Sequence, residues 1–324
     1  MFTTLGDFGP LSRRGHVRDI LTGMTTLDHW GGTSRHVDLD GAPVHYVDFG
    51  GEGPPMVLVH GLGGSHLNWC LLAPHLVDRY RVLAVDLAGF GLTHPEGRAT
   101  TVPANARLLE RFLAEVVGEP AVLVGNSMGG MIAILHAARR PASVTALALL
   151  DPAVPLALGA RLDPQVTAAF AMYAVPGLGQ WFLAKSRAGV STRRQVKRVL
   201  NLVCANAKAV PEEMVLASMS LLEQRAEIPG LDEAFLTAAR SVVWTGATRR
   251  RYYAAMSRVR VPVYLMAGDQ DRLVPVASAR EAARRNPSWR FDVLAGVGHV
   301  PQLEVPELVA SRIRDWLETS RLSG

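Results

Sequence analysis

Short apolar runs alternate along the chain with longer segments in which apolar residues recur at helical spacing. The apolar runs predict strands at 56–59, 81–85, 121–124, 144–150, 261–267 and 290–294. Helices are predicted at 67–76, 102–117 and 128–139, and from Ala277 and Pro306 onward. This alternation is typical of a parallel sheet with helices on both faces.

Two segments depart from this alternation. Residues 36–39 and 44–49 flank a turn at Asp40-Gly41 and predict a hairpin. Between Pro152 and about Gly230 no strand is expected, and the segment is interpreted as several helices interrupted by prolines. The simplest organisation is a helical cap, residues 152–231, inserted into a core formed by 36–151 and 232–324. Residues 1–35 are left as an N-terminal extension.

The composition is that of a globular protein. The 324 residues are 48% hydrophobic and 19% charged, which excludes disorder, collagen and coiled coil as the dominant state. No apolar run is long enough to span a bilayer, and residues 1–24 lack the apolar segment of a secretory signal. Cys70 and Cys204 form neither a disulfide framework nor a zinc site. We therefore expect a cytoplasmic protein with no metal and no stable membrane insertion.

The net charge of +5 raises the question of nucleic-acid binding. Two basic clusters lie at 193–198 and 249–251, and the second is followed by Tyr252 and Tyr253. Two adjacent aromatic residues do not make a base-stacking platform. Each cluster is interpreted as a solvated helix face, so no nucleic-acid partner is expected. The pattern predicts no particular oligomeric state.

Gly125-Asn126-Ser127-Met128-Gly129 fits the pattern G-x-S-x-G, at the junction of a predicted strand and a predicted helix. A sharp turn there forces strained backbone angles on the central residue, and the glycines let strand and helix approach closely. The serine oxygen would stand at a helix N-terminus, whose dipole favours developing negative charge. Ser127 is therefore predicted to be a nucleophile rather than only an N-cap.

A serine nucleophile needs a base, and His299 follows the last predicted strand in a glycine-containing loop. A carboxylate to orient that imidazole is expected after the strand at 261–267, where Asp271 is the first choice and Asp269 competes. Asp151, after the preceding strand, is a third candidate. The order Ser, Asp, His is that of α/β-hydrolases.

The loop from His60 to Ser65 is rich in glycine. It lacks both the third glycine of a dinucleotide fingerprint and the lysine of a phosphate loop, so no cofactor is expected. We interpret it as an oxyanion loop in which the backbone amides of Leu62 and Met128 are the two donors. Asp86, in the next glycine-rich loop, is interpreted as a structural residue that fixes loop backbone.

Together these motifs, in this order, closely resemble the α/β-hydrolase superfamily over residues 36–151 and 232–324. The resemblance implies an eight-stranded, mostly parallel α/β-hydrolase sheet with a helical cap that shapes the substrate pocket. It also implies a triad of Ser127, Asp271 and His299. By the same resemblance, haloalkane dehalogenases and epoxide hydrolases carry aspartate at the elbow. Serine at position 127 therefore points to the serine branch and to acyl transfer to water.

Residues 125–130 are also identical to the elbow found in hydrolases that cleave carbon–carbon bonds in ring-fission products. That subgroup commonly has tryptophan after the histidine, where this chain has Val300, and a cap arginine, where it has Ser218. Arg187 or Arg194 could replace that arginine. The expectation is a cofactor-free carboxylesterase acting on small to medium apolar esters through an acyl-enzyme. The alternatives are the C–C hydrolase and a ligand-binding receptor of the same fold.

Overall fold

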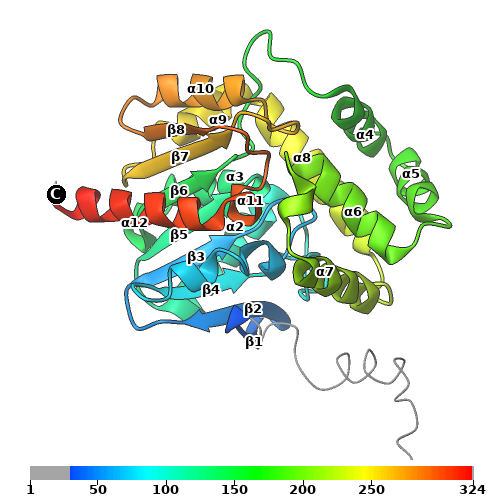
Figure 1. Cartoon of the computed structure of the whole chain (residues 1–324), viewed down its shortest axis with the longest axis horizontal. Helices are drawn as coiled ribbons and strands as arrows, with labels where there is room; N and C mark the ends of the chain where they lie inside the picture. The colour runs from blue at the N-terminus through cyan, green and yellow to red at the C-terminus, as the bar shows by residue number, and fades with distance from the viewer. Residues whose placement is uncertain (1–29, 323–324) are drawn as a thin grey trace, which may run out of the picture.

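The computed structural model describes residues 30–322, and the side chains of residues up to 320. The predictions for residues 1–29, which make up most of the expected N-terminal extension, lie outside this range. Eight strands form one sheet in the order β1-β2-β4-β3-β5-β6-β7-β8 (Figure 1). They are β1 (Thr33–Leu39), β2 (Ala42–Gly50), β3 (Pro55–Val59), β4 (Arg81–Val85), β5 (Ala121–Asn126), β6 (Val144–Leu150), β7 (Val263–Gly268) and β8 (Arg290–Leu294).

The sheet is mostly parallel, as the sequence predicts. β1 pairs with β2 and β2 with β4 in antiparallel register, while the pairs from β4 to β8 are parallel. β1 begins at Thr33, within the segment assigned to the N-terminal extension, so the sheet starts earlier than expected. The reason is that the hairpin extends upstream until Thr33 pairs with Asp48.

Both faces of the central strands are buried, because successive side chains point to opposite sides of a sheet. Val57 and Val59 of β3 join one apolar cluster, with α2 (Val102–Phe112), α3 (Met128–Ala137), α9 (Arg249–Met256) and α10 (Val276–Arg285). Met56 and Leu58 join the other, which includes α12 (Pro306–Leu322). In Figure 1 α12 crosses in front of the sheet, beside the short helix α11 (Pro301–Glu304).

The prediction of one continuous helix at 67–76 is wrong. The segment forms two short 3₁₀ helices, η2 (His66–Trp69) and η3 (Ala73–His75). Pro74 has no N–H to continue an α-helix, and Ser65 and Asn68 close a capping box that holds the first turn. The helix predicted at 102–117 is α2 followed by a π-helical turn, η4 (Leu113–Val117), which ends at Gly118.

The strandless segment after β6 consists of helices at one end of the sheet (Figure 1). They are α4 (Pro164–Ala174), α5 (Leu178–Arg187), α6 (Thr192–Val203), η6 (Ala207–Ala209), α7 (Glu212–Arg225) and α8 (Leu231–Ala247). α8 also contacts the core, since Thr100 Oγ1 donates to the carbonyl of Ala234 and the Val102 amide to Ser241 Oγ. The exact cap boundaries stay a prediction. No helix in the described range has the length and apolarity needed to cross a membrane.

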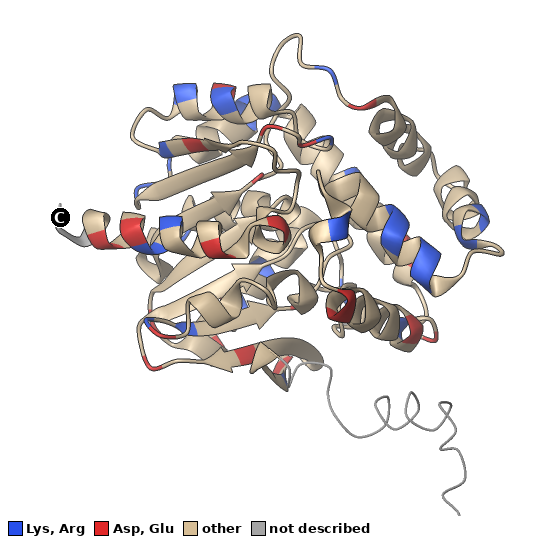
Figure 2. Ribbon diagram, in the orientation of Figure 1, with Lys and Arg blue, Asp and Glu red and all other residues tan. Residues whose placement is uncertain are grey.

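Charged side chains lie mainly on the helices and at the rim of the sheet, while the central strands carry few (Figure 2). Arg194, Lys197 and Arg198 of the first basic cluster are exposed on α6, and Arg193 pairs with Glu212. Tyr252, which follows the second cluster, is buried, and its hydroxyl donates to the carbonyl of Ala153.

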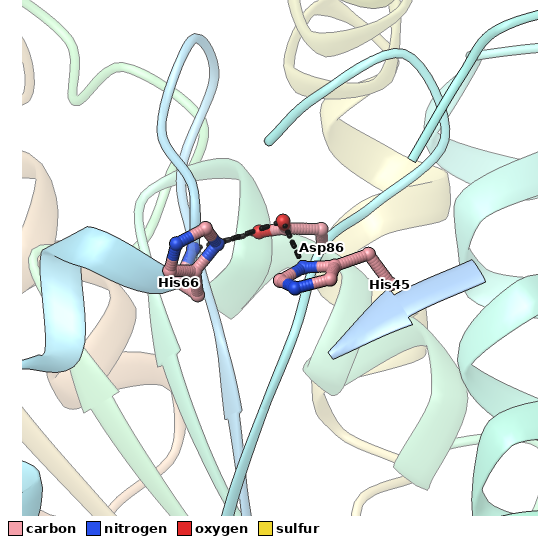
Figure 3. A group of neighbouring side chains, drawn as sticks. All are labelled: His45, His66 and Asp86. Carbon is pink, nitrogen blue, oxygen red and sulfur yellow. Dashed lines mark hydrogen bonds and ion pairs between the residues drawn. The ribbon is translucent and has the colours of Figure 1, made fainter. Parts of the chain in front are cut away.

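A buried network holds the hairpin, β4 and η2 together (Figure 3). Asp86 follows β4 and is fully buried. Its carboxylate accepts from Nδ1 of His45 at 2.7 Å, from Nδ1 of His66 at 2.8 Å, and from the amides of His66 and Leu92. Burial alone would raise the pKa of Asp86, but the two imidazoles hold it well below its usual range. The carboxylate thus fixes loop backbone, as the sequence predicts.

Replacing Asp86 should weaken the whole fold. Asp86→Ala leaves four donors without an acceptor, so the free energy of unfolding should fall by about 3 kcal/mol or more at pH 7. Because the folded-state pKa is depressed, this contribution is present above the unfolded value of about 3.9 and is lost as pH falls through the folded value. The stability gap between wild type and variant should therefore narrow below about pH 4.

Urea unfolding followed by circular dichroism across the pH range measures this gap. Asp78→Ala is the matched control, because Asp78 is exposed and its ion pairs in the described range are with Arg79 and Arg314 at the surface. Its effect should stay within about 0.5 kcal/mol. Equal losses in the two variants would contradict the assigned role of Asp86.

Candidate active site

Ser127 stands at the turn between β5 and α3 with φ 53° and ψ −119°. Positive φ is rare for a residue with a side chain and persists only where the surroundings enforce it. Here the Ser127 amide donates to the carbonyl of Leu150, and its own carbonyl accepts from the amides of Met131 and Ala153. Three flanking segments thus hold the strained turn, and Ser127 is partly exposed between the buried residues Asn126 and Met128.

Glycine is required around this turn because the backbones touch. A Cβ on Gly129 would lie 2.0 Å from the carbonyl oxygen of Val59, and one on Gly125 would lie 2.7 Å from Gly130. A Cβ on Gly61 would lie 2.9 Å from the Cβ of Ser127. The glycine-rich loop after β3 therefore lies directly against the serine.

His299 and Asp271 are hydrogen-bonded to each other. Nδ1 of His299 donates to Oδ2 of Asp271 at 2.7 Å, and both residues are buried. Oδ1 of Asp271 accepts from the amides of Leu273 and Val274 at 2.7 and 3.0 Å, so the carboxylate is fixed by its own turn. This bond leaves Nε2 of His299 as the ring nitrogen able to take a proton from a hydroxyl.

Asn126 connects the serine turn to the histidine loop. Its Nδ2 donates to the carbonyl of Leu150 at 3.0 Å and to the carbonyl of His299 at 2.9 Å. The Asn126 side chain thereby joins residues 126 and 299 directly, and Ser127 is the next residue along the chain. Within the described range Ser127 Oγ itself has no hydrogen bond, to His299 or to any other group. Such bonds are often long or absent until substrate is bound.

The end of α6 also holds the histidine loop. The His299 amide donates to the carbonyl of Val203 at 2.7 Å, and a Cβ on Gly298 would lie 2.6 Å from the amide nitrogen of Ala205. Glu304 bridges the two segments, because it accepts from the amide of Gly298 and from that of Ala205. Burial raises the pKa of Glu304, while these amides oppose the rise.

The amides of Leu62 and Met128 have no hydrogen-bond acceptor among the described residues. The Leu62 loop is positioned by His60, whose Nε2 accepts from the Leu87 amide at 3.0 Å while Nδ1 donates to the carbonyl of Gly61 at 2.8 Å. Burial lowers the pKa of His60 to about 4, so the ring is neutral at pH 7. Two free amides on segments beside Ser127 are what an oxyanion needs.

The three candidate acids have different hydrogen-bond partners. Asp271 bonds to His299, whereas Asp269 accepts from the amide of Gly296 in the loop after β8. Asp151 is fully buried near both Asp271 and His299 but makes no bond to the imidazole. Of the three carboxyls, Asp271 alone contacts the histidine in the described structure.

Two groups in the described range have the donor types of a cation site: His45, His66 and Asp86, and Asp151, Asp271 and His299. In the first group both Nδ1 atoms donate to one oxygen of Asp86, which also accepts from the Leu92 amide. In the second, Nδ1 of His299 donates to Asp271. The ring nitrogens facing the carboxylates are therefore used by hydrogen bonds.

Sequence reasoning missed two residues of this site. Asn126 lies inside the motif, but at a position that the pattern leaves open. Glu304 carries no signal, because its role depends on α6 lying beside the histidine loop. A half-buried glutamate five residues after a histidine has no local pattern that marks it.

Comparisons with known proteins show the family to which the chain belongs. Residues 56–312 match the family model described as the alpha/beta hydrolase family. A relative named as the dihydrolipoyllysine-residue acetyltransferase component of an acetoin cleaving system, from Cupriavidus necator, is 28% identical over 83% of this chain. The alignment spans 65% of that relative's length.

Two further similarities cover nearly the whole of the matched proteins. A pimeloyl-[acyl-carrier protein] methyl ester esterase from Aromatoleum aromaticum is 28% identical over 81% of this chain and 97% of its own length. The crystal structure of a membrane phospholipase A superposes with a TM-score of 0.68 at 27% identity, covering 95% of this chain and 91% of that one.

Asn126→Ala should loosen the join between the serine turn and the histidine loop. It leaves the buried carbonyl of His299 without this donor and leaves the carbonyl of Leu150 with the Ser127 amide, so the free energy of unfolding should fall by about 2 kcal/mol. Asn201→Ala on the exposed face of α6 is the matched control and should change it by less than about 0.5 kcal/mol. Thermal and urea unfolding measure both variants, and a neutral Asn126→Ala would contradict the assigned tie.

Proposed function

Because the chain belongs to the alpha/beta hydrolase family, we propose that it is a serine hydrolase that cleaves carboxylic esters of small to medium apolar substrates. The single observation that supports this most is the arrangement at the carboxyl ends of β5, β7 and β8. The loops after these strands, together with the loop after β3, carry a strained serine, an imidazole bonded to a carboxylate, and two amides without an acceptor among the described residues. A serine hydroxyl is a weak nucleophile without such a base.

In the proposed mechanism Oγ of Ser127 attacks the ester carbonyl while Nε2 of His299 takes its proton. Asp271 holds the other ring nitrogen and stabilises the imidazolium. The amides of Leu62 and Met128 donate to the oxyanion, each contributing about 3–4 kcal/mol to the transition state. His299 then protonates the departing alcohol. The resulting acyl-enzyme is hydrolysed by a water that His299 activates, which returns Ser127 to its free form.

An apolar substrate is supported by the aromatic residues near the oxyanion loop. Tyr173 makes edge contacts with Phe170, Phe182 and Phe235, and all four side chains are half-buried. Phe235 lies close enough to Gly63 that a Cβ there would be 3.4 Å from its ring. These rings join α4, α5 and α8 to the loop that would hold the oxyanion, which supports an apolar acyl or alcohol group in the proposed substrate.

The relatives support ester chemistry in different degrees. The esterase relative is matched over almost its full length, and its name describes methyl ester cleavage. The acetyltransferase relative is matched over part of its length, and its name describes acyl transfer to another acceptor. Both activities use an activated acyl group, and water is the acceptor that we propose here.

The contacts of the cap arginines favour ester cleavage over the C–C alternative. Arg187 pairs with Asp232, and Arg194 is exposed on α6. Arg225 is half-buried and donates to the carbonyls of Gly89 and Gly91. Within the described residues, none of these three arginines has a hydrogen bond with Ser127.

Ser127→Ala should reduce turnover of p-nitrophenyl esters by about four orders of magnitude or more, while leaving the unfolding temperature unchanged. A fluorophosphonate probe should label wild type at Ser127 and should not label the variant. Ser257→Ala, at an exposed serine directly after α9, is the matched control and should behave as wild type. Wild-type activity in Ser127→Ala would exclude the mechanism, and labelling without ester turnover would favour C–C cleavage.

Asp271→Asn should lower kcat by about 10⁴-fold with little change in KM, because the amide favours the wrong imidazole tautomer. Asp269→Asn, in the same turn, is the matched control and should retain most of the activity. Steady-state kinetics on the same esters separate the two. The reverse ranking would assign the acid to Asp269.

A further inference from the structure

Asp151 is a buried carboxyl next to the triad that the mechanism above does not use. It follows β6 with φ 43° and is 1% exposed. Its Oδ1 accepts from the Gly268 amide at 2.9 Å, whereas its Oδ2 is buried and has no hydrogen-bond partner in the part of the chain described. A buried polar atom without a partner is rare and costly, so this oxygen needs an explanation.

The neighbour of Asp151 is another carboxyl. Asp151, Asp271 and His299 each offer one polar atom, and the three atoms lie within 4.8 Å of one another. Oδ1 of Asp271 accepts two backbone amides and Oδ2 accepts from His299, so Asp271 has no proton to give. Two buried carboxylates this close repel each other when both are charged, which favours a proton on one of them.

The donors around each carboxyl decide where that proton resides. Asp271 receives three N–H groups, which requires an acceptor and favours the charged form. Asp151 receives only the Gly268 amide. Burial first, and then the charge of Asp271, raise the pKa of Asp151 well above its usual range, and Glu304 on α11 acts in the same direction. His299 faces the pair from the loop after β8.

We propose that Asp151 is a neutral carboxylic acid whose Oδ2–H donates to the carboxylate of Asp271, which makes it a positioning residue of the triad. This rests on the proposed function for its effect on activity. The added donor gives Asp271 a fourth hydrogen bond and holds Oδ2 of that carboxylate toward His299. It also limits the buried carboxyl pair to one negative charge, which matches the single positive charge of the imidazolium during the reaction.

The test compares wild type with Asp151→Asn and Asp151→Ala. Asparagine has the same shape, is neutral, and can both accept from Gly268 and donate to Asp271. Alanine can do neither. For each protein, NMR follows the titration of the His299 imidazole, assigned with His299→Gln, and the rate of fluorophosphonate labelling of Ser127 is measured against pH. Thermal unfolding reports the folded fraction, to which the rates are normalised.

We expect Asp151→Asn to keep the His299 titration midpoint of wild type and to label at a rate within about threefold of it. In Asp151→Ala the carboxylate of Asp271 has lost a donor, so the midpoint should rise and labelling should slow by about tenfold. An infrared band of a protonated carboxyl, present in wild type and missing in Asp151→Asn, would support the neutral form directly.

A fall of about one pH unit in the midpoint of Asp151→Asn would overturn the proposal, because it would mean that a negative charge had been removed. The same midpoint and rate in all three proteins would also overturn it, since Asp151 would then only fill space. If wild-type Ser127 does not label, the proposed function fails, and the NMR titration alone still decides the state of Asp151.

Discussion

The site depends on a contact that leaves no room for side chains. β5, α3 and the loop after β3 meet at Gly125, Gly129 and Gly61, where an added Cβ would overlap with a neighbouring chain. This close approach enforces the positive φ of Ser127. The same contact lays the loop of Leu62 against the serine, so nucleophile and expected oxyanion donors are positioned by one packing constraint. A side chain at any of these glycines would separate strand, helix and loop together.

The proposed base, His299, is positioned by a second set of contacts. His299 follows an edge strand, and its loop is held by the side chain of Asn126 on one side and by the end of α6 on the other. Glu304 adds two further bonds between that loop and the chain after α6. The helical segment that would contact a substrate is therefore bonded directly to the loop of the base. A shift of α6 would move His299 relative to Ser127, whose own turn would stay fixed.

Local pattern was sufficient for most of the fold and for choosing the residues that are proposed to be catalytic. The limits of β4, β6 and β8 match the predicted ranges, and in β4 and β6 a short apolar run corresponds to a strand that is almost entirely buried. The helix predicted at 67–76 was wrong because the prediction gave the apolar spacing more weight than Pro74. Asn126 and Glu304 were missed for another reason. Their roles depend on which segments the sheet order brings together, and β5 and β8 are not neighbours in the sheet.

Asp86 and Asp151 show why the ionisation of a buried aspartate cannot be read from sequence. Both end a central strand, and both are almost fully buried. Asp86 receives four donors, two of them imidazoles, and together these outweigh the effect of burial on its pKa. Asp151 receives one donor and faces a second carboxylate, so the rise in its pKa caused by burial is not cancelled. The number of donors, rather than depth, thus separates a structural anion from a neutral acid. At Asp151 that difference keeps one negative charge beside His299 instead of two.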